Sequence, residues 1–471
     1  MTESLLPEEF RLPPVVLGNP TMEAVDRDIA APLMHVPGAR WWIAFAVAAG
    51  VMLVGFALMG YTFAVGVGVW GINAPVYWAF AIVNFVFWIG IGHAGTLISA
   101  ILLLFRQRWR NAIARLSETL TIFAVMTAAM FPLLHLGRPW VFFWIFPYPN
   151  SLRLWVNFRS PLVWDVFAIL TYLTVSIMFW YVGLIPDLAA LRERAATRVH
   201  RAVYSFLSWG WTGLSRHWHH YELAYLILAG LATPLVLSVH TIVSFDFSTS
   251  IIPGWHSTIF PPYFVAGAVF SGFAMVMVVI LALRGYFHLE HLITMTHLDN
   301  MNKILLATSL MVGYSYVMEF FIAWYSADEI ERYAFHNRAF GPYWWALAIM
   351  LVGNVVAPQV HWFRRARRSI PVMFVVALAV LVGMWIERFV IIVVSLHRDF
   401  LPSAWGMYWP TIVDVGILAG SFGFFFTATL IFVRVLPSIS MTEVKSALPG
   451  AQPSIHAARP MVGRPVEKID V

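Results

Sequence analysis

Two ionisable residues stand on either side of a short connection between two apolar stretches of the chain. His135 lies in Phe-Pro-Leu-Leu-His-Leu-Gly-Arg-Pro-Trp (131–140), and Asp165 ends Arg-Ser-Pro-Leu-Val-Trp-Asp (159–165). The glycine and proline that follow His135 typically end a helix, and the Ser-Pro pair before Asp165 typically starts one. Histidine and aspartate can both accept protons, so this pair is a candidate for proton-transfer chemistry. The alternative is a structural pair that packs the loop.

The elements that position this pair are expected to be membrane-spanning helices. With 60% hydrophobic and 11% charged residues, the chain departs from soluble proteins, which carry about 25% charged residues. Apolar stretches of about 17 to 30 residues can cross a hydrocarbon core of about 30 Å, which predicts an all-α polytopic membrane protein with about ten transmembrane helices. They cover 42–63, 76–105, 117–136, 162–185, 223–243, 263–283, 304–325, 343–357, 371–395 and 413–435. The predicted divisions are an N-terminal tail at 1–41, a membrane domain at 42–435 and a C-terminal tail at 436–471.

The basic residues predict the orientation of these helices. Loops after the second, fourth, sixth and eighth stretches are rich in arginine, whereas the opposite loops hold few basic residues. Because such residues concentrate in cytoplasmic loops, both tails are expected in the cytoplasm and His135 and Asp165 at the outer face. An ionisable residue inside a membrane costs about 2.5 to 3.5 kcal/mol and is a functional candidate by default. The net charge of +6 then reflects topology, and we expect no nucleic-acid partner.

Further charged residues are expected near the same face. Helical rise places Arg388 about 25 Å from the inner end of its span, Asp246 falls just past the outer end of another, and Glu319 reaches the outer third of a third span. Arg388 can serve as a charge partner for Asp165 or Asp246, or as a donor to a substrate, and both roles stay open. Its neighbour Glu387 is expected to point elsewhere, because adjacent helical residues differ by about 100 degrees.

Three deeper residues suggest a proton path. His93 lies in Gly-His-Ala-Gly-Thr in the inner half of the second stretch, and Glu118 and Glu222 lie near inner helix ends. The alternative for each is helix packing, since the small residues around His93 also allow close helix contact. Because His240 is expected at the outer side and His93 at the inner side, an intramembrane haem with two histidine ligands fits poorly.

The chain has no cysteine, which excludes thiolate zinc sites, iron–sulfur clusters of the usual kind and covalently attached haem within it. Two histidine-rich patches, at 216–220 and 288–297, lack a defined ligand spacing, so we predict no metal site. Oxidation of a quinol releases protons and electrons and needs a proton acceptor beside the head group. His135, Asp165 and Arg388 suit that chemistry, and the electrons must then leave through another protein.

A short internal repeat and several motifs bear on the architecture. Val-His-Thr-Ile-Val-Ser-Phe-Asp-Phe (239–247) matches Ile-Val-Val-Ser-Leu-His-Arg-Asp-Phe (392–400) four spans later, which predicts parallel repeats of spans two to five and six to nine. The motifs are Gly-His-Ala-Gly-Thr-Leu-Ile-Ser-Ala (92–100), the 131–140 and 160–165 segments, His-Leu-Asp-Asn-Met-Asn-Lys (297–303) and Gly-Tyr-Ser-Tyr-Val-Met-Glu-Phe-Phe-Ile-Ala-Trp-Tyr-Ser (313–326). Through them, about residues 75–435 resemble the NrfD/PsrC family of quinone-interacting membrane subunits, most closely the ActC type of alternative complex III.

This resemblance implies a subunit of a respiratory or photosynthetic quinol:acceptor oxidoreductase in the bacterial inner membrane, built as two four-helix bundles plus two further helices. Quinol, with menaquinol the expected form, would be oxidised near the outer face. Electrons would pass to an extracytoplasmic iron–sulfur subunit and on to c-type haem subunits, beside a second NrfD-like membrane subunit and lipids. No haem or iron–sulfur cluster is expected in this chain.

The family pattern also implies roles for individual residues. His135 and Asp165 would be catalytic and line the quinol pocket, with Arg388 and Asp246 close by. The family pattern implies that Glu319, His93 and Glu118 conduct protons. Glu222 is expected to do so as well, because of its position near an inner helix end. Coupled proton translocation is a hypothesis on these grounds. Two alternatives stay open: a structural membrane anchor without a working quinone site, and a secondary transporter.

Overall fold

In the part of the chain that the computed structural model describes, ten helices are long and apolar enough to cross a membrane, which confirms the predicted all-α fold and number of spans. The structure describes residues 15–448 except 152 and 196. Eight of these helices are single, and the first six are α2 (Ala39–Val65), α6 (Ala114–His135), α7 (Pro161–Arg194), α9 (Ser215–Ser248), α10 (Phe260–Tyr286) and α11 (Met295–Tyr325). Near the carboxyl end follow α15 (Ile370–Leu396) and α16 (Ile412–Val435).

The other two spans contain wide π-helical turns. One span runs through α3 (Phe80–Ile91), α4 (His93–Thr96), the π turn η4 (Leu97–Ile101) and α5 (Leu102–Leu104). The other runs through α13 (Trp344–Leu351), the π turn η7 (Val352–Val356) and η8 (Ala357–Trp362). Single π turns inside α-helices are frequent at functional sites.

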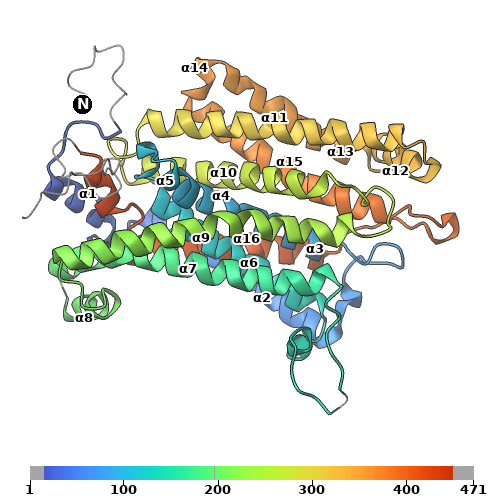
Figure 1. The fold of residues 1–471 in the computed structure, drawn as a ribbon, viewed down its shortest axis with the longest axis horizontal. Coiled ribbons are helices and arrows are strands. Elements are labelled where there is room, and N and C mark those ends of the chain that lie inside the picture. The colour runs from blue at the N-terminus through green and yellow to red at the C-terminus, as the bar shows by residue number, and fades with distance from the viewer. Residues whose placement is uncertain (1–14, 152, 196, 449–471) are drawn as a thin grey trace, which may run out of the picture.

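Short elements gather at the two ends of the bundle (Figure 1). At the end called here the α1 end lie α1 (Met22–Met34), α5, α8 (Arg198–Leu207) and α14 (Arg364–Arg367). The opposite end, called the α12 end, holds α12 (Glu329–Phe340). The remaining short elements are η3 (Val67–Val69), η5 (Arg108–Arg110), η6 (Pro139–Ile145), η9 (Pro402–Ala404) and α17 (Met441–Ser446).

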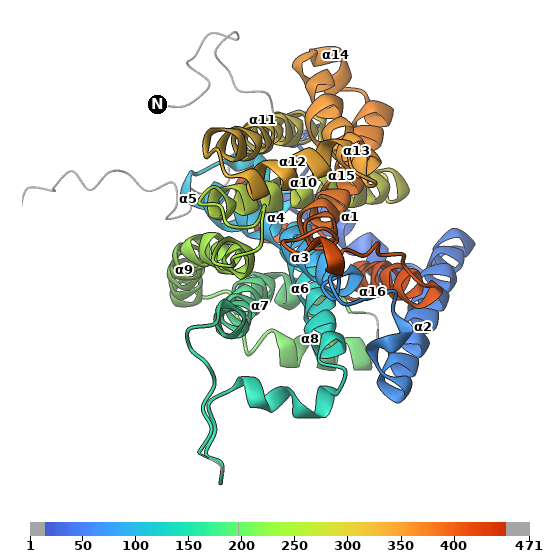
Figure 2. The same ribbon diagram turned by 90° about the vertical axis from the view of Figure 1, so that its right-hand side faces the viewer.

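Helices α3 and α10 occupy the centre of the bundle, where they pack against each other and against α6, α9 and α15. Helices α2 and α16 form a separate pair at one edge (Figure 2). That pair is in close backbone contact, because a Cβ on Gly55 would lie 2.4 Å from the Cα of Gly420. Small residues permit such close approach in membrane helices. The predicted division into two four-helix repeats stays a prediction.

The described part of the C-terminal tail folds back onto the bundle. Helix α17 packs against α1 and α7, and Ile439, Met441 and Val444 are buried. The sequence predicts a flexible tail or a strap over a partner here, whereas these residues form a strap over their own chain. Residues 1–14 and 449–471 of the two predicted tails lie outside the described residues.

Candidate functional site

His135 is the last residue of α6, as the sequence predicts, and it sits against two tryptophans. Its ring centroid lies 6.3 Å from that of Trp70 and 6.4 Å from that of Trp78. Trp78 in turn contacts the rings of Phe247 and Trp255, at 6.0 and 5.7 Å. The half-buried imidazole therefore borders an aromatic cluster at the α12 end, which offers flat apolar faces beside one proton-accepting ring.

Asp165 pairs with Asp246 instead of with His135. It sits in the second turn of α7 and is 5% exposed. Its carboxyl group lies next to that of Asp246, near the end of the adjacent helix α9, and the Oδ1 atom of each is buried without a hydrogen-bond partner among the described residues. An ionised carboxylate only accepts hydrogen bonds, so a bond between two carboxyl groups requires a proton on one of them. This pair can hold one proton and exchange it.

Arg388 does not form the predicted ion pair with Asp165 or Asp246. Its guanidinium is ion-paired with Glu387, the preceding residue of α15, and lies over the ring of Phe264 at 5.2 Å. The side chains of Glu387 and Arg388 therefore meet, contrary to the prediction that Glu387 points elsewhere. Arg388 is 1% exposed, and its Nε has no hydrogen-bond partner among the described residues.

Glu387 is the centre of a buried network that the sequence analysis missed. It accepts hydrogen bonds from the hydroxyl of Tyr316 on α11 and, at 3.3 Å, from the amide of Asn354. Asn354 also donates to the Tyr316 hydroxyl at 2.8 Å, and it lies within the π turn η7. The signal was present in the sequence: a Glu-Arg pair inside a span with no other charge, and a Gly-Asn pair in the shortest span.

Glu319 lies at the α12 end as expected, and it has a cationic partner. Arg338 of α12 approaches it at 3.8 Å and donates to the Gly254 carbonyl and the Ser395 hydroxyl at 2.7 and 2.9 Å. Glu319 also lines a cavity of about 520 Å³. Glu331 lines the same cavity, where partial burial raises the pKa of its carboxyl group although the Gly254 N–H donates to it.

His93 contacts His240, which contradicts the depths assigned to them from the sequence. Their ring centroids are 4.4 Å apart, and both side chains are fully buried. The Nδ1 of His93 bonds the Ile89 carbonyl at 2.8 Å, and Tyr172 stacks on the His93 ring at 5.5 Å. The two histidines therefore do not differ in depth, so depth gives no argument against haem ligation. Their rings are, however, in direct contact with each other.

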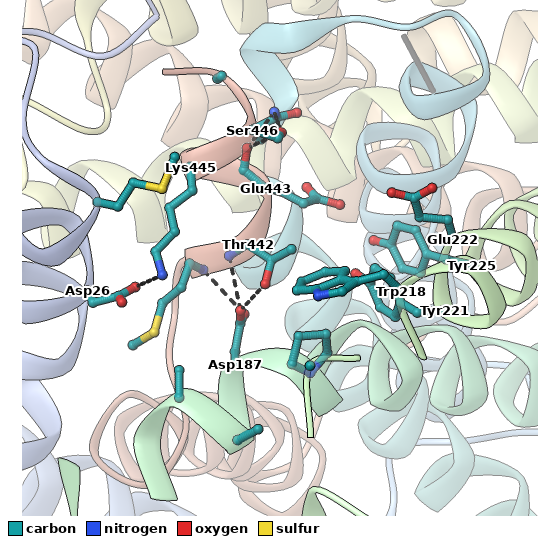
Figure 3. A pocket seen from close by; sticks show the side chains of 18 of the residues that line it. Asp26, Asp187, Trp218, Tyr221, Glu222, Tyr225, Thr442, Glu443, Lys445 and Ser446 are labelled. Atoms are coloured by element: carbon teal, nitrogen blue, oxygen red, sulfur yellow. Dashed lines mark hydrogen bonds and ion pairs between the residues drawn. The ribbon is translucent and has the colours of Figure 1, made fainter. Parts of the chain in front are cut away.

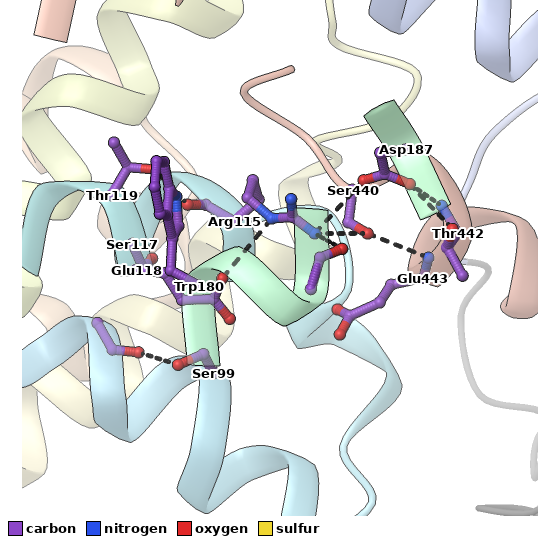
Figure 4. Close-up of polar contacts among 12 residues, drawn as sticks. Ser99, Arg115, Ser117, Glu118, Thr119, Trp180, Asp187, Ser440, Thr442 and Glu443 are labelled. Carbon is purple, nitrogen blue, oxygen red and sulfur yellow. Dashed lines mark hydrogen bonds and ion pairs between the residues drawn. The ribbon is translucent and has the colours of Figure 1, made fainter. Parts of the chain in front are cut away.

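Glu118 belongs to a buried ionic cluster near the α1 end (Figure 4). Its Oε2 lies 3.6 Å from Nε of Arg115, and its Oε1 accepts a hydrogen bond from Tyr225 at 3.0 Å. Arg115 also approaches Asp187 at 3.4 Å and donates to the Gly183 carbonyl at 2.6 Å. The sequence singled out Glu118 alone, because Asp187 and its partners come from segments far apart in the chain.

A cavity of about 1670 Å³ opens beside this cluster, and Glu222 lines it (Figure 3). Arg110 and Glu443, which also line it, form an ion pair at 2.5 Å. Burial works against the charge of Arg110, but the nearby carboxylate of Glu443 raises the pKa of this guanidinium above its ordinary value. Within the described residues, no group of three or more histidines and carboxylates is arranged to hold a metal ion.

Residues 68–398 match the family model described as polysulphide reductase, NrfD. The chain belongs to the NrfD family. The match includes every residue that the sequence analysis placed in a site. The matched residues do not include α2, α16 or the strap.

Two curated relatives agree with this membership. The chain is 22% identical, over 88% of its length and 98% of the relative, to the C subunit of the selenate reductase of Mesobacillus selenatarsenatis. It is 25% identical to the "Putative dimethyl sulfoxide reductase membrane subunit" of Halobacterium salinarum, where the alignment covers 51% of each protein. In the second case the chain spans about half the length of the relative. Both names describe subunits of reductases.

Proposed function

We propose that this chain is the quinol-oxidising membrane subunit of an oxidoreductase complex and that the Asp165–Asp246 pair accepts protons from the quinol. The observation that carries the proposal is the carboxyl–carboxyl contact at the α12 end, since one proton on two carboxyl groups leaves a second acceptor position free. Membership of the NrfD family and the names of the two relatives support a subunit of this class.

The chemistry assigns a separate task to each part of the site. Oxidation of one quinol releases two protons and two electrons. The carboxyl pair and His135 take protons, while the aromatic cluster of Trp70 and Trp78 provides flat surfaces for a quinone ring. Arg388 lies in the same half of the bundle. Its ion-pair partner is Glu387, and neither Asp165 nor Asp246 pairs with it.

The electrons leave through a partner protein in this proposal, because the chain has no cysteine for a cluster. An extracytoplasmic iron–sulfur subunit would receive them and pass them to c-type haem subunits, beside a second NrfD-like subunit. The motif resemblance favours an alternative complex III with menaquinol as donor. Copurification of haem and iron–sulfur subunits with this chain tests that assignment, and isolation with a molybdenum-dependent reductase subunit would contradict it.

Asp165→Asn tests the site directly. An amide cannot exchange the proton, so we expect quinol-to-acceptor electron transfer in membranes to fall by about 100-fold, the low end of the effect of a positioned acid or base. Glu329→Gln is the matched control, because Glu329 is an exposed carboxylate of α12 at the same end. Unchanged turnover of Asp165→Asn in an assembled complex would refute the site and favour a structural anchor.

A proton path through the bundle completes the proposal. Glu118 and Glu222 would take protons at the α1 end, His93 would relay them in the middle, and Glu319 would serve the α12 end. In the middle, the ring of Tyr172 stacks on that of His93, and the Tyr172 hydroxyl bonds Thr96 at 2.7 Å. Buried hydroxyl and imidazole groups of this kind can take part in a proton relay inside a membrane.

A further inference from the structure

The C-terminal strap, Ser440–Ser446, is fastened to the bundle by a buried carboxylate. Asp187 of α7 is fully buried and accepts hydrogen bonds from the backbone N–H groups of Met441 and Thr442, at 3.3 and 3.1 Å. The Thr442 hydroxyl adds a third bond at 2.9 Å (Figure 3). Lys445 pairs with Asp26 of α1 at 2.5 Å. These contacts hold the strap in one position relative to α1 and α7.

This position brings Glu443 to the wall of the α1-end cavity. One of its carboxylate oxygens pairs with Arg110, while Oε2 is buried and has no hydrogen-bond partner among the described residues. Nη1 of Arg110 is likewise buried without such a partner. Arg110 and Glu443 both line the cavity of about 1670 Å³, which is large enough to admit water.

The same cavity leads to Glu118 through one hydroxyl group. Tyr225 lines the cavity and donates its hydrogen bond to Oε1 of Glu118. Glu443 and Tyr225 line this cavity together (Figure 3). Arg115 completes the connection, because it contacts Glu118 and also donates to the Ser440 hydroxyl of the strap at 3.4 Å (Figure 4).

We propose that Glu443 is a proton-transfer residue that passes protons from water in this cavity, through Tyr225, to Glu118, with Arg110 positioning it. The inference rests on the proposed function, whose proton path begins at Glu118. In this proposal the Glu443 carboxylate takes a proton from cavity water and releases it toward the Tyr225 hydroxyl. That hydroxyl gives its own proton to Glu118 and regains one from Glu443, so each step transfers one proton and regenerates the carrier.

The test uses the whole purified complex in lipid vesicles, with quinol and an electron acceptor supplied. The measured quantities are the electron-transfer rate and the number of protons taken up from the α1 side per electron. In Glu443→Gln the electron transfer should continue while this proton uptake is lost, because an amide still accepts the bond from Arg110 but carries no exchangeable proton. Glu193→Gln is the matched control, since Glu193 is an exposed carboxylate that lines the same cavity.

Chemical rescue separates proton transfer from a structural role. In Glu443→Ala, added formate should enter the cavity and restore proton uptake, whereas a merely structural carboxylate would give no such recovery. Normal uptake in Glu443→Gln, or no rescue by formate, would overturn the inference. A wild-type complex that takes up no protons from this side would also overturn it, while loss of electron transfer in Asp165→Asn would still support the proposed quinol site.

Discussion

The two aspartates at the α12 end show what the sequence can and cannot predict about a site. Helix-start chemistry placed Asp165 correctly in the second turn of α7. Nothing in the linear pattern shows which side of α9 faces α7, so the sequence paired Asp165 with His135, which ends the preceding span. Tertiary packing selected Asp246 instead. The same limit explains why Glu387 and Asn354 were missed. Their hydrogen-bonded network with Tyr316 forms only when α11, α15 and η7 pack together.

A double-mutant cycle on this pair tests whether the two aspartates act as one acceptor. If they share a proton, Asp165→Asn and Asp246→Asn should each lower quinol oxidation, and the double variant should be no slower than the slower single variant. Groups in direct contact are strongly non-additive, whereas independent groups add. The measurement is the rate in membranes at equal amounts of assembled complex, and multiplied losses in the double variant would exclude a shared role.

At the scale of elements, composition and apolar length were enough to predict all ten spans, because each must satisfy its backbone hydrogen bonds inside a membrane. The structure lengthens most of the predicted spans, and it extends the shortest of them, 343–357, to Trp344–Trp362. Its apolar pattern is interrupted by the π turn that presents Asn354. The apolar pattern does not show how each helix is rotated about its own axis. This rotation depends on local contacts between small residues of neighbouring helices.

The contact between α2 and α16 supplies a prediction at this scale. In Gly55→Ala the added Cβ meets the backbone of Gly420, so the helices must separate, and we expect a loss of about 1 to 3 kcal/mol, typical of overpacking. Gly60→Ala on the same helix is the control, because no atom lies within 4 Å of its added Cβ. A lower thermal unfolding midpoint of the purified protein should appear only for Gly55→Ala, and equal midpoints would contradict the close contact.

For the whole molecule, the distribution of basic residues predicts that the α1 end faces the cytoplasm and the α12 end faces outward. The absence of cysteine makes this orientation directly measurable, since any introduced thiol of this chain is unique. Thr249→Cys and Ser205→Cys place exposed thiols at the end of α9 and on α8. A membrane-impermeant maleimide should label the first and not the second in spheroplasts, and the reverse pattern would invert the topology.

The strap also has a consequence for the order of biosynthesis. Asp187 enters the membrane with α7, yet the backbone groups that bind its carboxylate are translated more than 250 residues later, since the Met441 bond alone spans 254 positions. Until then α7, which inserts early, carries the Asp187 carboxylate without the backbone N–H groups of Met441 and Thr442. Arg115, already present on α6, is the neighbour that can neutralise it during this interval. The cavity wall therefore closes only late in translation, and a stalled or truncated chain would leave this end of the bundle open to water.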